Sequence, residues 1–387
     1  MHRVHVVRKK ATQESHPTVH LARFPRDRRV LELRSRLGPE DAKELRCQGN
    51  RIAIVAVGKV LAMIRSALRA LKQLGIDPDS VDPSVVAIVA LTPSIVAGAL
   101  FFRLLAVEML GIAIGVALAA YAAARFRKEA LDTVPLLPAL VAVALLGPGA
   151  SPAWVVAVAL VAVALELARD RYTPGARLQV GLVAYSLLWI VSRGATSAYV
   201  NPGSTTPAAE PIRFWLAYFG AAQAPIDPVR LYVGNVAGPV FATSVLAVAV
   251  GAAWLWYSRR MSLLVVLTFI AGVTVPIVMR GWSPVYQLLS GPLWFGAALV
   301  LADRRNLPRS PIGRPLVGLV AGATAMWLRA RGLAIESTLA AMAGVQVGVV
   351  GIQGTVWLGR NRRRVRMRLQ ELRSATEVKP VLPAGPN

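Results

Sequence analysis

The sequence predicts an all-α polytopic membrane protein, and three observations lead to this fold class. Hydrophobic residues make up 55% of the 387 residues, and the mean hydropathy is +0.52, both more than a soluble core needs. Apolar runs recur between residues 85 and 358. Basic residues are few in these runs and gather in the first 72 residues, in short connections and in the tail at 359–387, as membrane proteins distribute charge.

The N-terminal part is predicted to stay outside the bilayer. Residues 1–50 are polar and basic with no apolar core of a signal peptide, so we expect a cytoplasmic arm. In residues 51–80, Leu61, Ile64 and Leu68 recur at helical spacing while basic residues occupy another face. This pattern predicts an amphipathic helix on the membrane surface, followed by a linker.

About ten apolar segments then form the membrane region, and several are shorter than the roughly 20 residues of a straight crossing. They are residues 85–102, 104–124, 134–146, 154–168, 179–191, 236–257, 261–279, 285–302, 315–328 and 335–358. An even number predicts two inverted five-helix repeats with broken helices, at 81–192 and 233–358, around an outward loop at 193–232. The third and eighth segments share leucine pairs next to prolines, which favours a midplane binding site; coincidence in leucine-rich sequence is the alternative.

The distribution of Lys and Arg predicts the orientation. Alternate connections are rich in these residues: Arg125, Arg127 and Lys128, then Arg169, Arg171 and Arg177, then Arg259 and Arg260, then Arg304, Arg305, Arg309 and Arg314, then the tail. The positive-inside rule therefore places both termini in the cytoplasm, in a multi-pass protein of the plasma membrane.

Several chemistries are excluded by residue usage. Cys47 is the only cysteine, so the chain forms no internal disulfide and is not expected to hold an iron-sulfur cluster. All four histidines lie in the first 20 residues, which rules out a bis-histidine haem or a histidine metal site inside the bilayer. The net charge of +24 follows the pattern of a membrane protein, so we expect contact with the lipid bilayer and no nucleic acid partner. Redox chemistry here requires an organic carrier.

One stretch offers an attachment point for such a carrier. Thr196 follows Gly194 and Ala195 where the fifth apolar segment meets the outward loop. Glycine permits positive φ and alanine adds no bulk, so a large planar group has room beside the main chain while bonded to the threonine oxygen. An ordinary loop threonine is the alternative. The same tripeptide at residues 322–324 is flanked by apolar residues and predicts helix packing.

The order of motifs from residue 85 to 353 resembles a known family, the NqrB/RnfD membrane proteins of the sodium-translocating NADH:quinone reductase and of the Rnf electron-transport complexes. The tripeptide at 194–196 is similar to the family's Ser-Gly-Ala-Thr flavinylation motif. Residues 243–247 resemble its Thr-Ser-x-Leu-Ala run, and residues 289–332 its glycine-spaced stretch. Arg193, Ala242 and Arg304 depart from the family pattern at polar positions, which indicates a divergent member.

The resemblance implies that Thr196 carries FMN through a phosphoester, installed by a separate flavin transferase outside the cytoplasm. Ser197 is the adjacent competitor, and Arg193 is either a partner of the flavin phosphate or an interfacial snorkelling residue. The chain would be one component of a complex that passes electrons, coupled to Na⁺ or H⁺ movement, with other membrane and soluble subunits as partners. Whether a second, noncovalent flavin binds between the repeats is left open.

Two intramembrane carboxylates are candidates for an ion pathway, because charges in lipid are costly. Glu108 has no oppositely charged residue within a turn, whereas Glu166 has Arg169 at i+3 and favours a structural ion pair. Two other function classes remain: a flavin-free solute transporter or channel of the same five-plus-five fold, resembling urea permeases, and an anchor whose basic arm recruits anionic lipids or a cytoplasmic partner.

Overall fold

The computed structural model describes residues 82–127, 134–173, 175–204, 206–218 and 226–376. They belong to one compact unit, Asp77–Asn387. The predicted cytoplasmic arm at 1–50 and the amphipathic helix at 51–80 lie outside the described residues. Among the described residues, regular structure is helical, with two isolated β-bridges and no strand.

The first half of the membrane region folds into five helices near the predicted positions. They are α3 (Pro83–Phe102), α4 (Leu104–Phe126), α5 (Leu136–Ala144), α6 (Pro152–Tyr172) and α7 (Val180–Val191). Asp82 caps α3 by accepting from the amide of Ser84 at 2.6 Å, and proline follows at the first helical position. Arg103, with φ of 50°, turns the chain directly from α3 into α4.

The described residues of the loop at 193–232, which is predicted to face outward, contain three short helices. They are the 3₁₀ helix η1 (Ala195–Ser197), α8 (Pro211–Tyr218) and α9 (Pro228–Val233). Acidic residues begin two of them: Asp227 caps α9 through the amide of Val229, and Glu210 accepts from the first amides of α8.

The second half begins after an irregular stretch that packs against the end of α5. Its elements are α10 (Val245–Tyr257), α11 (Leu263–Met279), α12 (Pro284–Leu289), the π-helix η2 (Phe295–Leu301), α13 (Gly313–Ala330) and α14 (Glu336–Thr376). The amides of Val240 and Phe241 donate to Leu146 O and Ala144 O, and these bonds join the two halves at the centre. The last helix continues past residue 358, where the sequence predicted that it ends.

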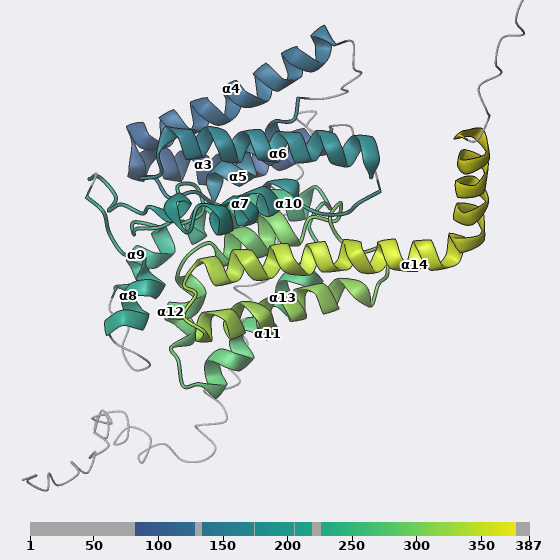
Figure 1. Ribbon diagram of the computed structural model, residues 1–387. Helices are drawn as coiled ribbons and strands as arrows, with labels where there is room; N and C mark the ends of the chain where they lie inside the picture. The colour runs from purple at the N-terminus through teal and green to yellow at the C-terminus, as the bar shows by residue number, and fades with distance from the viewer. Residues whose placement is uncertain (1–81, 128–133, 174, 205, 219–225, 377–387) are drawn as a thin grey trace, which may run out of the picture. The chain divides into compact units, whose positions relative to one another are not determined.

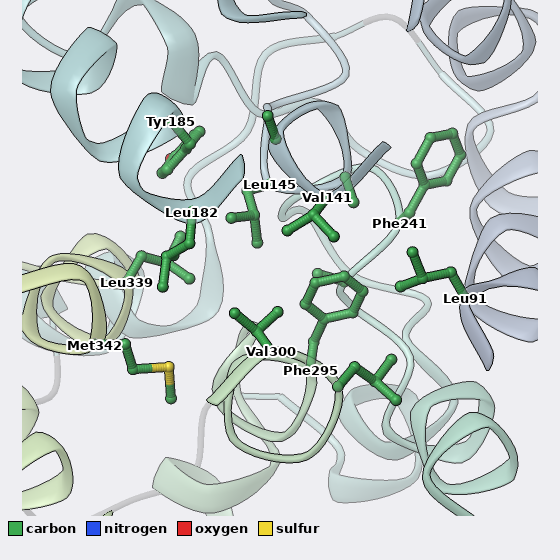
Figure 2. Close-up of a cluster of buried hydrophobic side chains, with 14 of the residues drawn as sticks. Leu91, Val141, Leu145, Leu182, Tyr185, Phe241, Phe295, Val300, Leu339 and Met342 are labelled. Atoms are coloured by element: carbon green, nitrogen blue, oxygen red, sulfur yellow. The ribbon is translucent and has the colours of Figure 1, made fainter. Parts of the chain in front are cut away.

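The third and eighth segments are interrupted, as predicted. The third reduces to the nine residues of α5, about 13 Å of helix. In the eighth, α12 ends at Leu289, Gly291 adopts φ of +77°, and η2 follows. Figure 2 shows how these short helices fill the core, with Val141 of α5 near Val300 and Phe295 of η2.

Glycines bring α11 and α13 into close contact (Figure 1). A Cβ at Gly318 would lie 2.5 Å from Val265 O, and one at Gly272 would lie 2.5 Å from Leu319 O. Gly322 meets the main chain of Phe269 in the same way. The second Gly-Ala-Thr tripeptide therefore serves helix packing, as predicted.

The apolar helices identify an integral membrane protein. Within the described residues, four helices are long and apolar enough to cross a bilayer: α3, α4, α6 and residues Glu336–Trp357 of α14. The helices α7, α10 and α11 are apolar but shorter, with 12, 13 and 17 residues. The all-helical membrane class is thus confirmed, while ten spans in two inverted repeats stay a prediction.

Candidate functional site

The turn that carries Thr196 begins where α7 ends. Gly194 has φ of +90°, a left-handed conformation that glycine permits. Arg193 has φ of 49°, which is unfavourable for a side chain with a Cβ and was not predicted. The turn closes with Ser197 N donating to Gly194 O at 2.9 Å, which forms η1.

This turn is docked on the connection between α5 and α6. The amide of Gly147 donates to Thr196 O, and the amide of Gly149 donates to Ala198 O, both at 2.9 Å. A Cβ on Gly147 would collide with the main chain of Ala198, so the close approach depends on glycine.

The hydroxyl of Thr196 is covered in this conformation. The residue is 0% exposed, and its Oγ1 lies 3.3 Å from the Oγ of Ser192. Ser197 is also buried and lies 3.4 Å from the phenol oxygen of Tyr185. Arg193 and Ala195 are exposed instead. The attachment role predicted from the sequence requires a reachable hydroxyl, whereas in the structure the threonine is buried under its docked turn.

The space beside the turn lies at Gly194. A Cβ there would meet no atom within 4 Å. Arg193 and Ala195 on either side of this glycine are exposed, whereas the side chain of Thr196 is buried.

The two ion-pathway candidates lie apart on different helices. Glu166 accepts from Arg169 at 2.6 Å, so it forms the predicted structural ion pair near the end of α6. Glu108 is exposed on α4 and borders a hollow of about 190 Å³ beside Pro148. It makes no hydrogen bond or ion pair with any residue that the structure describes, and the hollow joins it to no second carboxylate.

A buried cluster of charged and polar side chains where α13 ends and α14 begins was missed by the sequence analysis. Arg329, fully buried at the end of α13, donates to Gln287 Oε1 at 2.8 Å and to Thr338 Oγ1 at 3.1 Å. Glu336 begins α14 and is 2% exposed; Arg213 of α8 donates to it at 3.3 Å. The cluster ties the outward loop to the second half of the membrane region.

Glu210 is the second buried carboxyl of this region. It is 0% exposed and accepts from the amides of Ile212 at 2.6 Å and Arg213 at 2.9 Å. Burial, and secondly the negative charge of Glu336, raises the pKa of Glu210 to about 7. An acidic residue directly before Pro211 is a helix-start signal that would have located this capping role in the sequence.

The comparison with known proteins agrees with the resemblance of the motifs. The sequence model of the NQR2, RnfD, RnfE family matches residues 79–342. This match extends from the start of α3 into α14 and includes the Thr196 turn. No curated protein matches the chain.

Proposed function

The chain belongs to the NQR2, RnfD, RnfE family, and from this premise we propose that it is the flavin-carrying membrane subunit of an ion-translocating electron-transport complex. The family indicates a membrane subunit of such a multi-subunit complex. The proposal adds covalent FMN on Thr196, coupling to Na⁺ or H⁺ movement, and a plasma-membrane location with both termini in the cytoplasm.

The proposed architecture is two inverted five-helix repeats. Five helices precede the outward loop, and the interrupted α12–η2 segment occupies in the second half the place of short α5 in the first. The first helices of the two halves pack against each other, α3 against α10, and so do the last helices, α7 against α14. Interrupted helices at matching positions are typical of inverted-repeat membrane proteins.

The residues around Thr196 fit the chemistry of a phosphoester. The ester needs a hydroxyl, a neighbouring donor for the phosphate oxygens and space for a large ring. Ser192 and the exposed Arg193 can donate to the phosphate, and the open side of Gly194 offers the space. FMN, when bound, would supply one- and two-electron transfer. The chain's part is to fix the flavin at the outer end of α7 by one covalent bond.

The burial of Thr196 means that flavin attachment requires the turn to open. For a flavin transferase to reach the Thr196 oxygen, η1 must swing away from the α5–α6 connection. Two hydrogen bonds, from Gly147 and Gly149, hold it there. We therefore propose that flavin attachment takes place on an opened turn, before or during assembly with partner subunits.

The test is covalent flavin on the full chain, co-expressed with a flavin transferase and separated in a denaturing gel. Ultraviolet fluorescence is expected for the unchanged chain and absent for Thr196→Val. Thr324→Val is the matched control, because it alters the same tripeptide inside α13; it should keep the band. A band that persists in Thr196→Val, or no band in the unchanged chain, contradicts the proposal.

A flavin-free transporter or channel of the same fold is the second candidate. The observation that favours it is the burial of Thr196, since an attachment residue should be reachable. This candidate predicts that mass spectrometry of the peptide containing residues 194–196, taken from the native host, finds only the unmodified threonine.

A further inference from the structure

A polar cavity of about 410 Å³ lies at the opposite end of the helices from the Thr196 turn. The start of α5, the end of α6 and Gln179 just before α7 line it. Ser84 of α3 and Arg305, Asn306 and Arg309 of the connection between η2 and α13 complete the lining. Its volume is within the range of small-ligand sites. Its charged lining consists of Arg169, Arg177, Arg305, Arg309, Glu166 and Asp170.

The carboxylates of this region are already paired. Arg169 contacts Glu166 at 2.6 Å and Asp170 at 2.8 Å. Arg305 is held by Asp303 at 2.9 Å, just outside the lining. Glu166 and Asp170 share the single guanidinium of Arg169 and together keep one net negative charge. The four arginines of the described lining outnumber its two carboxylates, so the cavity as a whole still favours an anion.

Two arginines keep donors for a ligand. Arg177 uses Nη1 to donate to Leu307 O at 3.0 Å, and this bond orients the guanidinium in the cavity wall. Arg309 is exposed and forms no ion pair or hydrogen bond within the described part of the chain. A guanidinium fork matches the oxygens of a phosphate group.

Two helices also begin at this cavity. Pro135 and Gln179 precede α5 and α7, both line the cavity, and neither gives its helix a side-chain cap. In the first turn of α5 the amide of Leu136 donates to Val134 O at 2.7 Å and Pro138 has no N–H, which leaves only the amide of Leu137 there. The positive end of each helix dipole still favours an anion. The helix ends and the arginines thus act in the same direction from different elements.

We propose that this cavity binds a phosphate group, held by Arg177 and Arg309 beside the N-terminal ends of α5 and α7. Its two arginine-rich connections belong to the set that the positive-inside rule assigns to the cytoplasm. Acidic phospholipids are abundant in that leaflet, and basic pockets between membrane helices there bind their head groups. The headgroup of an acidic phospholipid and free phosphate share the required chemistry. The site does not depend on flavin at Thr196.

The test is native mass spectrometry of the delipidated full chain, titrated separately with phosphatidylglycerol, phosphatidylcholine and inorganic phosphate. The dissociation constant of the tightest bound phosphatidylglycerol should rise about tenfold in Arg309→Gln, since one charged hydrogen-bonding partner contributes roughly that factor. Arg309 makes no bond within the described part of the chain that its replacement would break, so this variant keeps the fold. Arg177→Lys, which keeps the charge but removes the fork, should weaken binding less than Arg309→Gln.

The matched control is Arg259→Gln, an exposed arginine in another arginine-rich connection and outside the cavity. It should bind phosphatidylglycerol like the unchanged chain. Inorganic phosphate that binds alone, with the same sensitivity to Arg309→Gln and no preference for phosphatidylglycerol over phosphatidylcholine, identifies free phosphate as the source and keeps the site. The proposal is overturned if phosphatidylglycerol and inorganic phosphate each bind Arg309→Gln as tightly as the unchanged chain. It is also overturned if Arg259→Gln weakens binding as much as Arg309→Gln does.

Discussion

The same three residues, Gly-Ala-Thr, occur twice in this chain and adopt different structures. At 194–196 they form a left-handed residue followed by η1, and the glycine lies in open space. At 322–324 they continue α13, and the glycine lies against the main chain of α11. A tripeptide therefore does not determine its role; the residues that surround it do.

The difference lies in what each glycine is needed for. Gly194 is needed for its backbone angle, because φ of +90° is unfavourable for other residues. Gly322 is needed for its missing side chain, because any Cβ would collide with Phe269 O. Substitutions that add volume should separate the two copies sharply, whereas substitutions that change only backbone freedom should affect the first copy alone.

The largest effect is expected in the second copy. The double variant Gly318→Val and Gly322→Val places two Cβ atoms against the main chain of α11 and should lower the free energy of unfolding by about 5 kcal/mol. The fraction recovered as monodisperse protein measures the loss. Gly344→Val with Gly348→Val is the control at the same spacing in α14, where a Cβ meets nothing within 4 Å. Equal recovery of both double variants would contradict the packing role.

The second effect is a pH dependence of stability, which is expected near the first copy because Glu210 lies in the loop that follows it. The chain after the first copy is linked to Glu210 through the bond from Ala208 N to Tyr199 O, at 3.0 Å. Because the folded pKa of Glu210 is about 7, above its ordinary value of 4.5, its contribution is fully present below pH 4.5 and is lost as pH rises to about 7. The loss is up to about 3 kcal/mol.

Thermal unfolding of the full chain between pH 5 and 8 measures this loss. Glu210→Gln keeps one acceptor oxygen for the α8 amides and should flatten the stability profile across that range. Ser204→Ala, an exposed position in the same loop, should leave the profile unchanged. A Glu210→Gln profile parallel to that of the unchanged chain would show that the carboxyl does not titrate there.

The structure of the second Gly-Ala-Thr copy could be predicted from the sequence much more fully than that of the first. Around the second copy, hydrophobicity and glycine spacing were enough, because packing of apolar helices is a local pattern read along one face. Around the first copy, the glycine indicated backbone freedom at residue 194, and nothing in the sequence predicted the burial of Thr196. That burial depends on Gly147 and Gly149, some fifty residues earlier, and no local pattern connects them to the turn.

The buried charges show the same limit. Glu166 with Arg169 was predictable because i and i+3 positions face each other on a helix. The bond between Arg213 and Glu336 joins residues 123 positions apart, and Arg329 reaches Gln287 across 42 positions. An acidic residue at a helix start is a common local feature, but the burial of Glu336 and its contact with Arg213 of α8 depend on residues far away in the sequence.

The third effect concerns the docking of the first copy. Gly147→Ala should push the main chain of Ala198 away and cost about 2 kcal/mol, and it should also uncover residue 196. The accessibility of the side chain at position 196 is measured by the rate of maleimide labelling in the double variant Thr196→Cys and Cys47→Ser, which has one cysteine. Labelling should be slow in this background and faster when Gly147→Ala is added. Gly175→Ala, where a Cβ meets nothing within 4 Å, is the control and should leave the rate unchanged.

The smallest effect tests the backbone angle of the first copy. Gly194→Ala adds a methyl group in open space, so its cost is strain alone, about 1 kcal/mol, read from thermal unfolding. Gly194→Asn should cost less, because asparagine tolerates the left-handed region better than alanine does. If Asn and Ala are equally destabilising, side-chain volume and not φ is what matters at this position. The first copy would then resemble the second, and the distinction between the two glycines would fail.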